Sequence, residues 1–487
     1  MTATPNTLLD RPPAVLNIGI DGLNASVTAS GGTLTHLPWH PPGDADPALA
    51  WQLARLLGDA RIEAANALAT QRIIASRPMW EDIALRADSV WPEMRGTRLL
   101  LHAGPPVEWG EMCGPMHGAM IGAALYEGWA DTPQAGMQML ERGEVEFAQC
   151  HDFHAVGPMT GIISASMPLI QVRDATHGNL AYTNINEGIG RCLRFGANGP
   201  DVLRRLKWFE SVAAPVLKAG VRREFDRCGG IDLKAIQSQA LLMGDEVHSR
   251  NAASTSLLFM ALAVPLAAVS RDGDTIAAGP VHQTLDFIAK SSQFFLNYSM
   301  VSCKAIMDAA HGIPFSTVVT AIARNGTKTG LRISGMGNEW FTAKSDLPQG
   351  LFFPGFKQED ACPDIGDSAI TETAGFGGCS FAASPALTLL AGGTVSDAVR
   401  YSREMAEICV TRNPGLSLPA LDFAGAPCGI DVRLVVDTGI RPVVTTGIAH
   451  KEAGVGQIGA GIVRVPMQAY VSACRAIATK FLEEKSV

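Results

Sequence analysis

Charged residues are scarce in this chain of 487 residues. Asp, Glu, Lys and Arg together make up 18% of it, whereas hydrophobic residues make up 47%. So few charges cannot cover the whole surface of a monomer of this size. We therefore expect part of the surface to be buried between subunits, most simply in a homo-oligomer.

A net positive charge is also missing. The formal net charge is −8 at pH 7, which excludes a large basic surface of the kind that binds nucleic acid or an anionic membrane. We expect neither nucleic acid nor a membrane as a partner. A site for a small anion would have to be local.

Targeting and membrane-spanning segments are not evident. Residues 1–13 lack the basic and apolar regions of a secretory signal. The most apolar run, residues 256–269, contains Pro265 and is shorter than the roughly 20 residues that cross a bilayer, so it predicts a core helix. The ten cysteines form no C-x-x-C pair, which predicts reduced thiols and a cytoplasmic location.

Common catalytic signatures do not occur. The sequence has no phosphate-binding Walker motif, nucleophile elbow or H-E-x-x-H motif. Gly454, Gly456 and Gly459 formally match the dinucleotide fingerprint, but the preceding strand ends early and Pro466 delays the next helix. We interpret this segment as an anion-binding or packing loop and expect no cofactor.

The apolar pattern predicts a multidomain α/β protein, because 487 residues exceed one ordinary core. Strand patterns at residues 15–20 and 33–39 flank a short helical one, so the N-terminal region is expected to be Rossmann-like. Asp46 is placed to cap a helix over residues 47–57. A helix over 62–74 and a strand over 98–101 follow.

The middle of the chain predicts helices over residues 202–221, 232–269 and 281–310. Beyond residue 335 the pattern predicts strands over 429–436 and 442–448 and a closing helix over 466–484. We therefore predict an N-terminal α/β domain (1–105), a Gly-rich α/β core domain (106–205 and 346–487) and a helical domain (206–345). Residues 324–326 and 372–378 are interpreted as turns.

Histidines and cysteines gather between residues 102 and 154. His102 follows the strand over 98–101, at the end of a strand where open α/β sheets hold ligands. The spacing of Cys113, His117, Cys150, His151 and His154 could supply a zinc site, but it is looser than that of structural zinc sites. We favour acid/base or hydrogen-bonding roles for His151 and His154 and expect no metal.

An anion site is predicted in residues 186–196. Glycines such as Gly188 let backbone N–H groups approach an anion, and Arg191 and Arg194 would share a face near the start of a helix here. The planar guanidinium matches phosphate or carboxylate. Asn186 and Glu187 belong to the same candidate site. A turn followed by a solvated helix is the alternative.

A polar strip is predicted in residues 243–251. On a helix, Asp245, His248 and Asn251 share one face, so that the carboxylate would orient the imidazole and the amide would bind substrate. The alternative is an exposed helix with a Glu246–Arg250 pair. The loop that contains His450, Gly456 and Gln457 is a further candidate for substrate binding.

Several of these segments resemble the YlbE/YahG-type family: His102-Ala-Gly-Pro-Pro106, Cys113-Gly-Pro-Met-His117-Gly-Ala, His154-Ala-Val-Gly-Pro-Met-Thr-Gly, residues 186–198, Met243-Gly-Asp-Glu, Gly447-Ile-Ala-His450 and residues 456–461. The resemblance spans nearly the whole chain. It implies a subunit of oxamate carbamoyltransferase, of the AllG type, which acts with companion subunits in allantoin and purine catabolism. The implied reaction turns oxalurate and phosphate into oxamate and carbamoyl phosphate.

Carbamoyl transfer passes through a tetrahedral centre flanked by a phosphate and a carboxylate, so it requires cations, N–H donors and a proton-transfer residue. We assign Arg191 and Arg194 to the anions, His151 or His154 to the oxyanion or proton, and Asp245 with His248 to an orienting pair. These residues are expected to line one pocket. The alternatives are another acyl- or carbamoyl-phosphate enzyme with a CoA-ligase-like companion, and a non-catalytic scaffold subunit.

Overall fold

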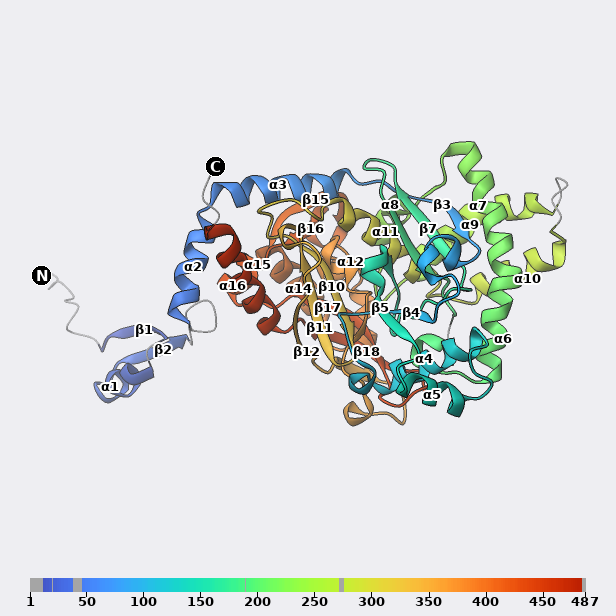
Figure 1. The fold of residues 1–487 in the computed structure, drawn as a ribbon. Helices are drawn as coiled ribbons and strands as arrows, with labels where there is room; N and C mark the ends of the chain where they lie inside the picture. The colour runs from blue at the N-terminus through green and yellow to red at the C-terminus, as the bar shows by residue number, and fades with distance from the viewer. Residues whose placement is uncertain (1–11, 20, 38–45, 189, 271–275, 484–487) are drawn as a thin grey trace, which may run out of the picture.

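The computed structural model describes residues 12–19, 21–37, 46–188, 190–270 and 276–483. In it, several small β-sheets lie among helices, and the expected α/β class is confirmed (Figure 1). Segments far apart in the sequence form the main body together. The N-terminal strands lie to one side of it.

The chain begins with a βαβ unit, as the pattern predicts. Strands β1 (Ala14–Ile18) and β2 (Thr33–Leu37) are parallel and are joined through α1 (Asn24–Ala29). They form a sheet of two strands. Ile20 and Trp39, which end the two predicted strand patterns, lie outside the described residues.

Two helices then join this unit to the main body. The carboxylate of Asp46 accepts the N–H of Ala48 and caps α2 (Pro47–Leu57), and α3 (Ala60–Ala75) follows. Both predicted helices are confirmed. Helix α2 buries Leu49, Leu53 and Leu56 in a core shared with the closing helix α16 (Met467–Glu483), which is also confirmed.

The next strands pair with strands from later in the chain. β3 (Pro78–Ala84) lies in a five-stranded sheet of order β6-β8-β7-β3-β9, and β4 (Leu99–His102) pairs in parallel with β5 (Glu146–Gln149). The other strands of this sheet are β6 (Ala155–Val156), β7 (Leu169–Asp174), β8 (Leu180–Asn184) and β9 (Ile231–Asp232), of which β7 and β9 pair with β3. Strand pairing therefore crosses residue 105, and the domain boundaries stay a prediction.

Helices dominate the chain from residue 114 to residue 309, apart from strands β5–β9: α4 (Gly114–Tyr126), α5 (Pro133–Glu141), α6 (Pro200–Trp208), α7 (Ala214–Cys228), α8 (Leu233–Leu242), α9 (Ala252–Val269), α10 (Ala278–Ala289) and α11 (Phe295–Ala309). A π-helical turn, Phe209–Ala213, joins α6 to α7, so the predicted helix over 202–221 is confirmed. The single helix predicted over 232–269 is wrong. Residues 243–251 form a loop, in which Gly244 (φ 95°) and Val247 (φ 65°) are left-handed.

Helix α9 contains the most apolar run of the sequence. Among the described residues it is the helix that is long and apolar enough to cross a membrane, by length and composition alone. Core helices pass the same test, and 39% of the residues in its apolar window are buried. It contacts α7, α8 and α10, which is compatible with the core helix that we predict.

After the helices, strands begin earlier in the chain than predicted. Residues 206–345 are mainly helical only as far as Ala309, because β10 (Val319–Asn325), β11 (Lys328–Ile333) and β12 (Phe341–Lys344) follow. They form an antiparallel sheet with β14 (Ile365–Gly366), in the order β12-β11-β10-β14. A second antiparallel sheet has the order β13-β18-β17, with β13 (Gln349–Phe352), β17 (Val443–Ala449) and β18 (Gln457–Arg464).

The C-terminal part contains a further hairpin, β15 (Cys409–Leu418) with β16 (Ala424–Ile430), and the helices α12 (Ile370–Thr373), α13 (Thr388–Ala391), α14 (Val395–Glu407) and α15 (Val432–Thr438). The strand predicted over 442–448 is confirmed by β17. The strand predicted over 429–436 is wrong beyond Ile430, because Asp431 accepts the N–H of Arg433 and starts α15.

Candidate functional site

A cavity in the main body gathers polar side chains from distant segments. Its empty volume is about 700 Å³, part of it open to solvent. Three of the predicted site residues line it, Arg194, His248 and Gln457, together with Ser249, Gln293 and Ser368. Phe353 and Leu390 line it as well and are partly exposed.

Arg194 is the cation of this cavity. It is only 8% exposed, its Nη2 donates to the carbonyl oxygen of Gly188 over 2.8 Å, and its buried Nε has no partner. Within the described part of the chain no carboxylate forms an ion pair with it. Because a buried guanidinium is costly to leave uncompensated, this arrangement favours the binding of an anion.

The loop around Arg194 is held by Glu187, Asn186 and Gly188. The carboxylate of Glu187 accepts the backbone N–H groups of Leu193 (2.7 Å) and Arg194 (3.0 Å). The side-chain oxygen of Asn186 accepts the N–H of Gly188, which is left-handed (φ 80°). These bonds fix the loop, and the helix expected here begins only at Pro200.

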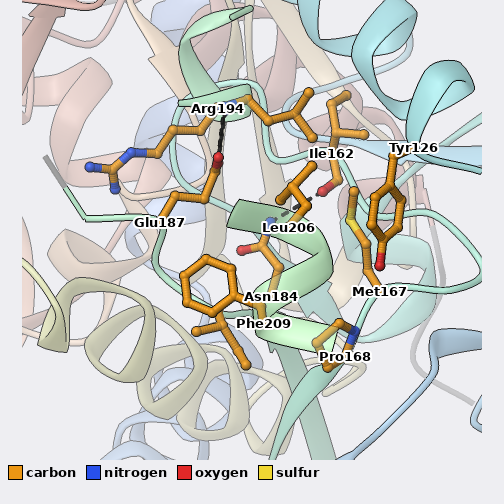
Figure 2. A pocket seen from close by; sticks show the side chains of 11 residues that line it. Tyr126, Ile162, Met167, Pro168, Asn184, Glu187, Arg194, Leu206 and Phe209 are labelled. Atoms are coloured by element: carbon orange, nitrogen blue, oxygen red, sulfur yellow. Dashed lines mark hydrogen bonds between the residues drawn. The ribbon is translucent and has the colours of Figure 1, made fainter. Parts of the chain in front are cut away.

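A smaller, mainly apolar pocket also borders this loop (Figure 2). Leu206, Phe209 and Tyr126 line it. Figure 2 shows the guanidinium of Arg194 pointing away from these side chains, while Glu187 bonds to its backbone. Arg194 therefore lines both cavities, but its charge is directed away from the apolar pocket.

His248 is paired with a carboxylate that the sequence analysis did not assign to it. Its Nδ1 lies 2.9 Å from Oε1 of Glu372, and both side chains are buried. Since an ionised carboxylate only accepts, Nδ1 donates the proton and Nε2 is left as the acceptor. The expected pairing of Asp245 with His248 is not formed, because residues 243–251 are a loop.

Glu372 is fixed by several donors. Its carboxylate accepts the N–H groups of Gly378 (3.1 Å) and Thr445 (3.2 Å) and the hydroxyl of Thr371 (3.0 Å). A Cβ atom on Gly377 would lie 1.9 Å from Oε1 of Glu372. Only glycine fits at position 377, so the turn expected at residues 372–378 shapes this carboxylate site.

Asp245, Glu246 and Asn251 support the loop that carries His248. Asp245 accepts the N–H of Ser254 over 2.8 Å. Burial raises the pKa of Asp245 and raises that of Glu246 to about 7. The side-chain amide of Asn251 donates to the carbonyl oxygen of His248 over 2.6 Å. Asn251 thus holds the loop and does not line the cavity.

The loop with His450, Gly456 and Gln457 is the turn of an antiparallel hairpin. It connects β17 to β18, and the N–H of His450 donates to Gly456. The dinucleotide fingerprint is therefore not formed, since no helix follows the glycines. The N–H of Gly454 donates to the carbonyl oxygen of Phe195 over 2.9 Å, which ties this turn to the Arg194 loop.

His102 and His151 are both buried, and His151 lies beside the buried carboxylate of Asp367. Asp367 accepts the N–H groups of Gly104 (2.8 Å) and Gly157 (3.1 Å), and its Oδ1 lies 3.6 Å from Nε2 of His151. Burial raises the pKa of Asp367 to about 7 and lowers that of His151 well below its usual value. Neither histidine lines the cavity, although Ser368, next to Asp367, does.

The other predicted residues lie apart. His154 is on the surface, where its Nδ1 pairs with Asp308 over 2.9 Å, and Arg191 is exposed. The possible zinc ligands are dispersed: Cys113 donates to Asn325, His117 contacts the carbonyl of Trp109, and Cys150 donates to Gly161. In the described ranges no group of three or more His, Cys, Asp or Glu side chains could hold a metal ion.

The cavity thus combines the groups that anion binding and proton transfer require. Arg194 supplies a positive charge, His248 an imidazole held by Glu372, and Gln457, Gln293 and Ser368 amides and a hydroxyl. Glu372, Gln293 and Ser368 were not predicted from the sequence. The glycines at 375, 377 and 378 could have indicated that Glu372 has a role in the site. No feature of the sequence indicates such a role for Gln293 or Ser368.

Comparison with known proteins places the chain among close relatives. A family model described as "Oxamate carbamoyltransferase subunit AllG" matches residues 145–368. The chain is 51% identical over 415 residues to the protein of that name from Escherichia coli (strain K12), covering 85% of this chain and 97% of the relative. It is 42% identical over 471 residues to "Uncharacterized protein YahG" of the same organism, covering 96% and 97%.

A solved structure is also similar. It is that of a conserved protein of unknown function from Enterococcus faecalis V583, with a TM-score of 0.81 and 40% sequence identity. The match covers 86% of this chain and 98% of the other. The fold described above is therefore shared by a relative of known structure.

Proposed function

Because this chain belongs to the family of the oxamate carbamoyltransferase subunit AllG, we propose that its cavity is where a carbamoyl group moves between a small ureido acid and phosphate. The substrates are oxalurate and phosphate in the catabolic direction, and the products are oxamate and carbamoyl phosphate. Companion subunits complete the complex. A cytoplasmic location fits the ten free cysteines.

One observation supports this proposal: Arg194, which is buried and forms no ion pair with a carboxylate of the described residues, lines the same cavity as His248 of the Glu372–His248 pair. A carbamoyl acceptor and its donor are both anions, so a buried cation that is in no ion pair with a described carboxylate suits them. Both oxygens of a phosphate or carboxylate can bond to one guanidinium.

In this proposal His248 moves the single proton that the reaction requires. An oxygen of hydrogen phosphate attacks the ureido carbonyl carbon, and Nε2 of His248 accepts the phosphate proton. When the tetrahedral centre collapses, the bond to the oxamate nitrogen breaks and His248 returns the proton to that nitrogen. Glu372 holds the ring through Nδ1 and stabilises its charged form.

The proposal is tested with the purified complex of this chain and its companion subunits. Oxalurate and phosphate are supplied, and carbamoyl phosphate is measured. We expect His248→Gln to lower kcat about 100-fold or more, the usual contribution of acid/base catalysis. His282→Gln, at an exposed histidine of α10, is the matched control and should leave kcat unchanged.

Arg194→Lys tests the anion site. Lysine keeps the charge but loses the two-pronged geometry, so we expect KM for the anionic substrate to rise about tenfold or kcat to fall. Unchanged kinetics would remove Arg194 from the site. If both variants left the complex fully active, the chain would be a scaffold, and if no ureido acid gave carbamoyl phosphate, the complex would use another acyl or carbamoyl phosphate.

A further inference from the structure

Two cysteines from distant parts of the chain lie against each other beside the β10–β11 turn. Cys113 immediately precedes α4, and Cys362 precedes β14. A Cβ atom built on Gly326 would lie 2.4 Å from Sγ of Cys113 and 3.4 Å from Sγ of Cys362. Both sulfur atoms therefore lie close to the same point, and the interaction between the thiols shifts the pKa of each. A side chain at position 326 would collide with Cys113, so glycine at this position lets the turn pass close to the sulfur atoms.

The two thiols differ in accessibility and in acidity. Cys113 is partly exposed and sits at the N-terminus of α4, whereas Cys362 is 1% exposed. The interaction with Cys362, with help from the backbone N–H of Met116, lowers the pKa of the Cys113 thiol. The same contact and burial raise the pKa of the Cys362 thiol. Cys113 is therefore the thiol that an oxidant meets first.

We propose that Cys113 and Cys362 form a reversible disulfide when the protein meets a peroxide. The Cys113 thiolate attacks one oxygen of hydrogen peroxide and becomes a sulfenic acid, and the other oxygen leaves and is protonated to water. The sulfur of Cys362 then attacks the sulfenic sulfur, the S–S bond forms, and a second water leaves. Two thiols are oxidised by two electrons, which the peroxide takes up. A cellular thiol reductant reverses the step.

The bond would restrain the β17–β18 turn, because the segments that it joins already hold that turn. A Cβ atom on Gly114 would lie 2.2 Å from the carbonyl oxygen of Lys451, so α4 starts directly against the turn. On the other side, the N–H of Cys362 donates to Ala449 over 2.8 Å, and the N–H of Lys451 donates to Asp360 over 2.8 Å. The turn leads into Gln457 of the cavity.

The full-length protein offers internal controls. The thiols of Cys379 and Cys409 also interact with each other, but they are 0% and 8% exposed, so peroxide should leave them reduced. Cys228 is exposed and should be oxidised without forming an intrachain disulfide. If a Cys113–Cys362 disulfide forms under the same treatment, it would therefore depend both on the proximity of the two thiols and on the access of peroxide to Cys113.

The test treats the reduced full-length chain with hydrogen peroxide, blocks remaining thiols with an alkylating reagent, and identifies linked peptides by mass spectrometry. We expect a Cys113–Cys362 linkage that dithiothreitol removes. In Cys362→Ser, a dimedone-trapped sulfenic acid should accumulate at Cys113, and in Cys113→Ser, Cys362 should stay a thiol. Melting curves confirm that both variants fold.

Two results would overturn the inference. Alkylation of both cysteines as free thiols, at a peroxide dose that oxidises Cys228, would show that the pair does not react. Oxidation of Cys113 to a sulfinic acid while Cys362 stays reduced would show that Cys362 does not resolve it. The restraint is measured separately: amide exchange in residues 450–456 should slow about tenfold on oxidation, and unchanged exchange would refute it.

Discussion

The side chain of Glu246 illustrates how burial controls a single ionisable group beside the cavity. It is fully buried, and its carboxylate accepts the N–H groups of Ser249 and Arg250 and the hydroxyl of Thr445. Burial outweighs these bonds and raises its pKa to about 7. The alternative considered from the sequence was a side-chain ion pair between Glu246 and Arg250 on a helix. Instead, the carboxylate of Glu246 accepts the backbone N–H of Arg250 within a loop.

This pKa predicts a pH-dependent stability. Because the pKa of Glu246 is higher in the folded chain than its ordinary value of 4.5, the folded state holds the proton more tightly. The contribution of this proton to the free energy of unfolding is complete below about pH 4.5 and is lost as the pH rises through 7. The loss reaches at most about 1.4 kcal/mol per pH unit.

The measurement compares the wild type with Glu246→Gln by denaturant unfolding at pH 5, 6, 7 and 8. The free energy of unfolding of the wild type, minus that of Glu246→Gln, should fall as the pH rises to about 7 and then level off. Glu339→Gln, at an exposed position, should give a difference that does not change with pH. Parallel curves for Glu246→Gln would contradict the assigned titration.

At the scale of the element, helix α4 packs closely against the loop that carries Arg194. A Cβ atom on Gly118 would lie 2.2 Å from the carbonyl oxygen of Gly196, directly after the turn that contains Arg194. The corresponding atom on Gly136 of α5 would make only an ordinary contact, 3.5 Å from Ile121. The two helical glycines therefore differ in packing and not in local conformation.

We expect Gly118→Ala to destabilise the protein by about 1–3 kcal/mol, because backbone atoms must move apart. It should also weaken phosphate binding, since the displaced loop carries Arg194. Gly136→Ala should be neutral or stabilising by up to about 1 kcal/mol, the usual gain of alanine in a helix. Thermal unfolding and calorimetric titration with phosphate measure both effects, and equal behaviour of the two variants would refute the described packing.

At the scale of the whole molecule, the N-terminal βαβ unit is separate from the rest. β1 and β2 pair with each other, and Figure 1 shows them apart from the body that contains the cavity. The E. coli relative AllG matches over 97% of its own length with only 85% of this chain. A family member therefore has no counterpart for part of this chain.

Removal of residues 1–45 should leave the melting temperature within about 2 °C of the wild type and the complex active, because no core helix is lost. Removal of residues 1–58 also deletes α2 and should destabilise the protein strongly. Leu49, Leu53 and Leu56 are buried against α16 and contribute about 2 kcal/mol each. Strong destabilisation by the shorter deletion would show that the βαβ unit supports the main body.

The sequence by itself determined the local elements. The pattern of apolar residues predicted the α/β class, and Asp46 and Pro47 marked the start of α2. The sequence also singled out Arg194, which lines the cavity, although its role in anion binding stays a prediction. These inferences depend on neighbours within a few positions, since helix periods, caps and turns are local properties of the chain.

Only the tertiary structure decided which side chains meet. His248 is paired with Glu372, 124 positions away, and not with Asp245. His151 does not line the cavity and lies against Asp367, which accepts an N–H from a residue 263 positions away. The partner of a buried group depends on how distant segments pack, and a periodic pattern carries no information about that.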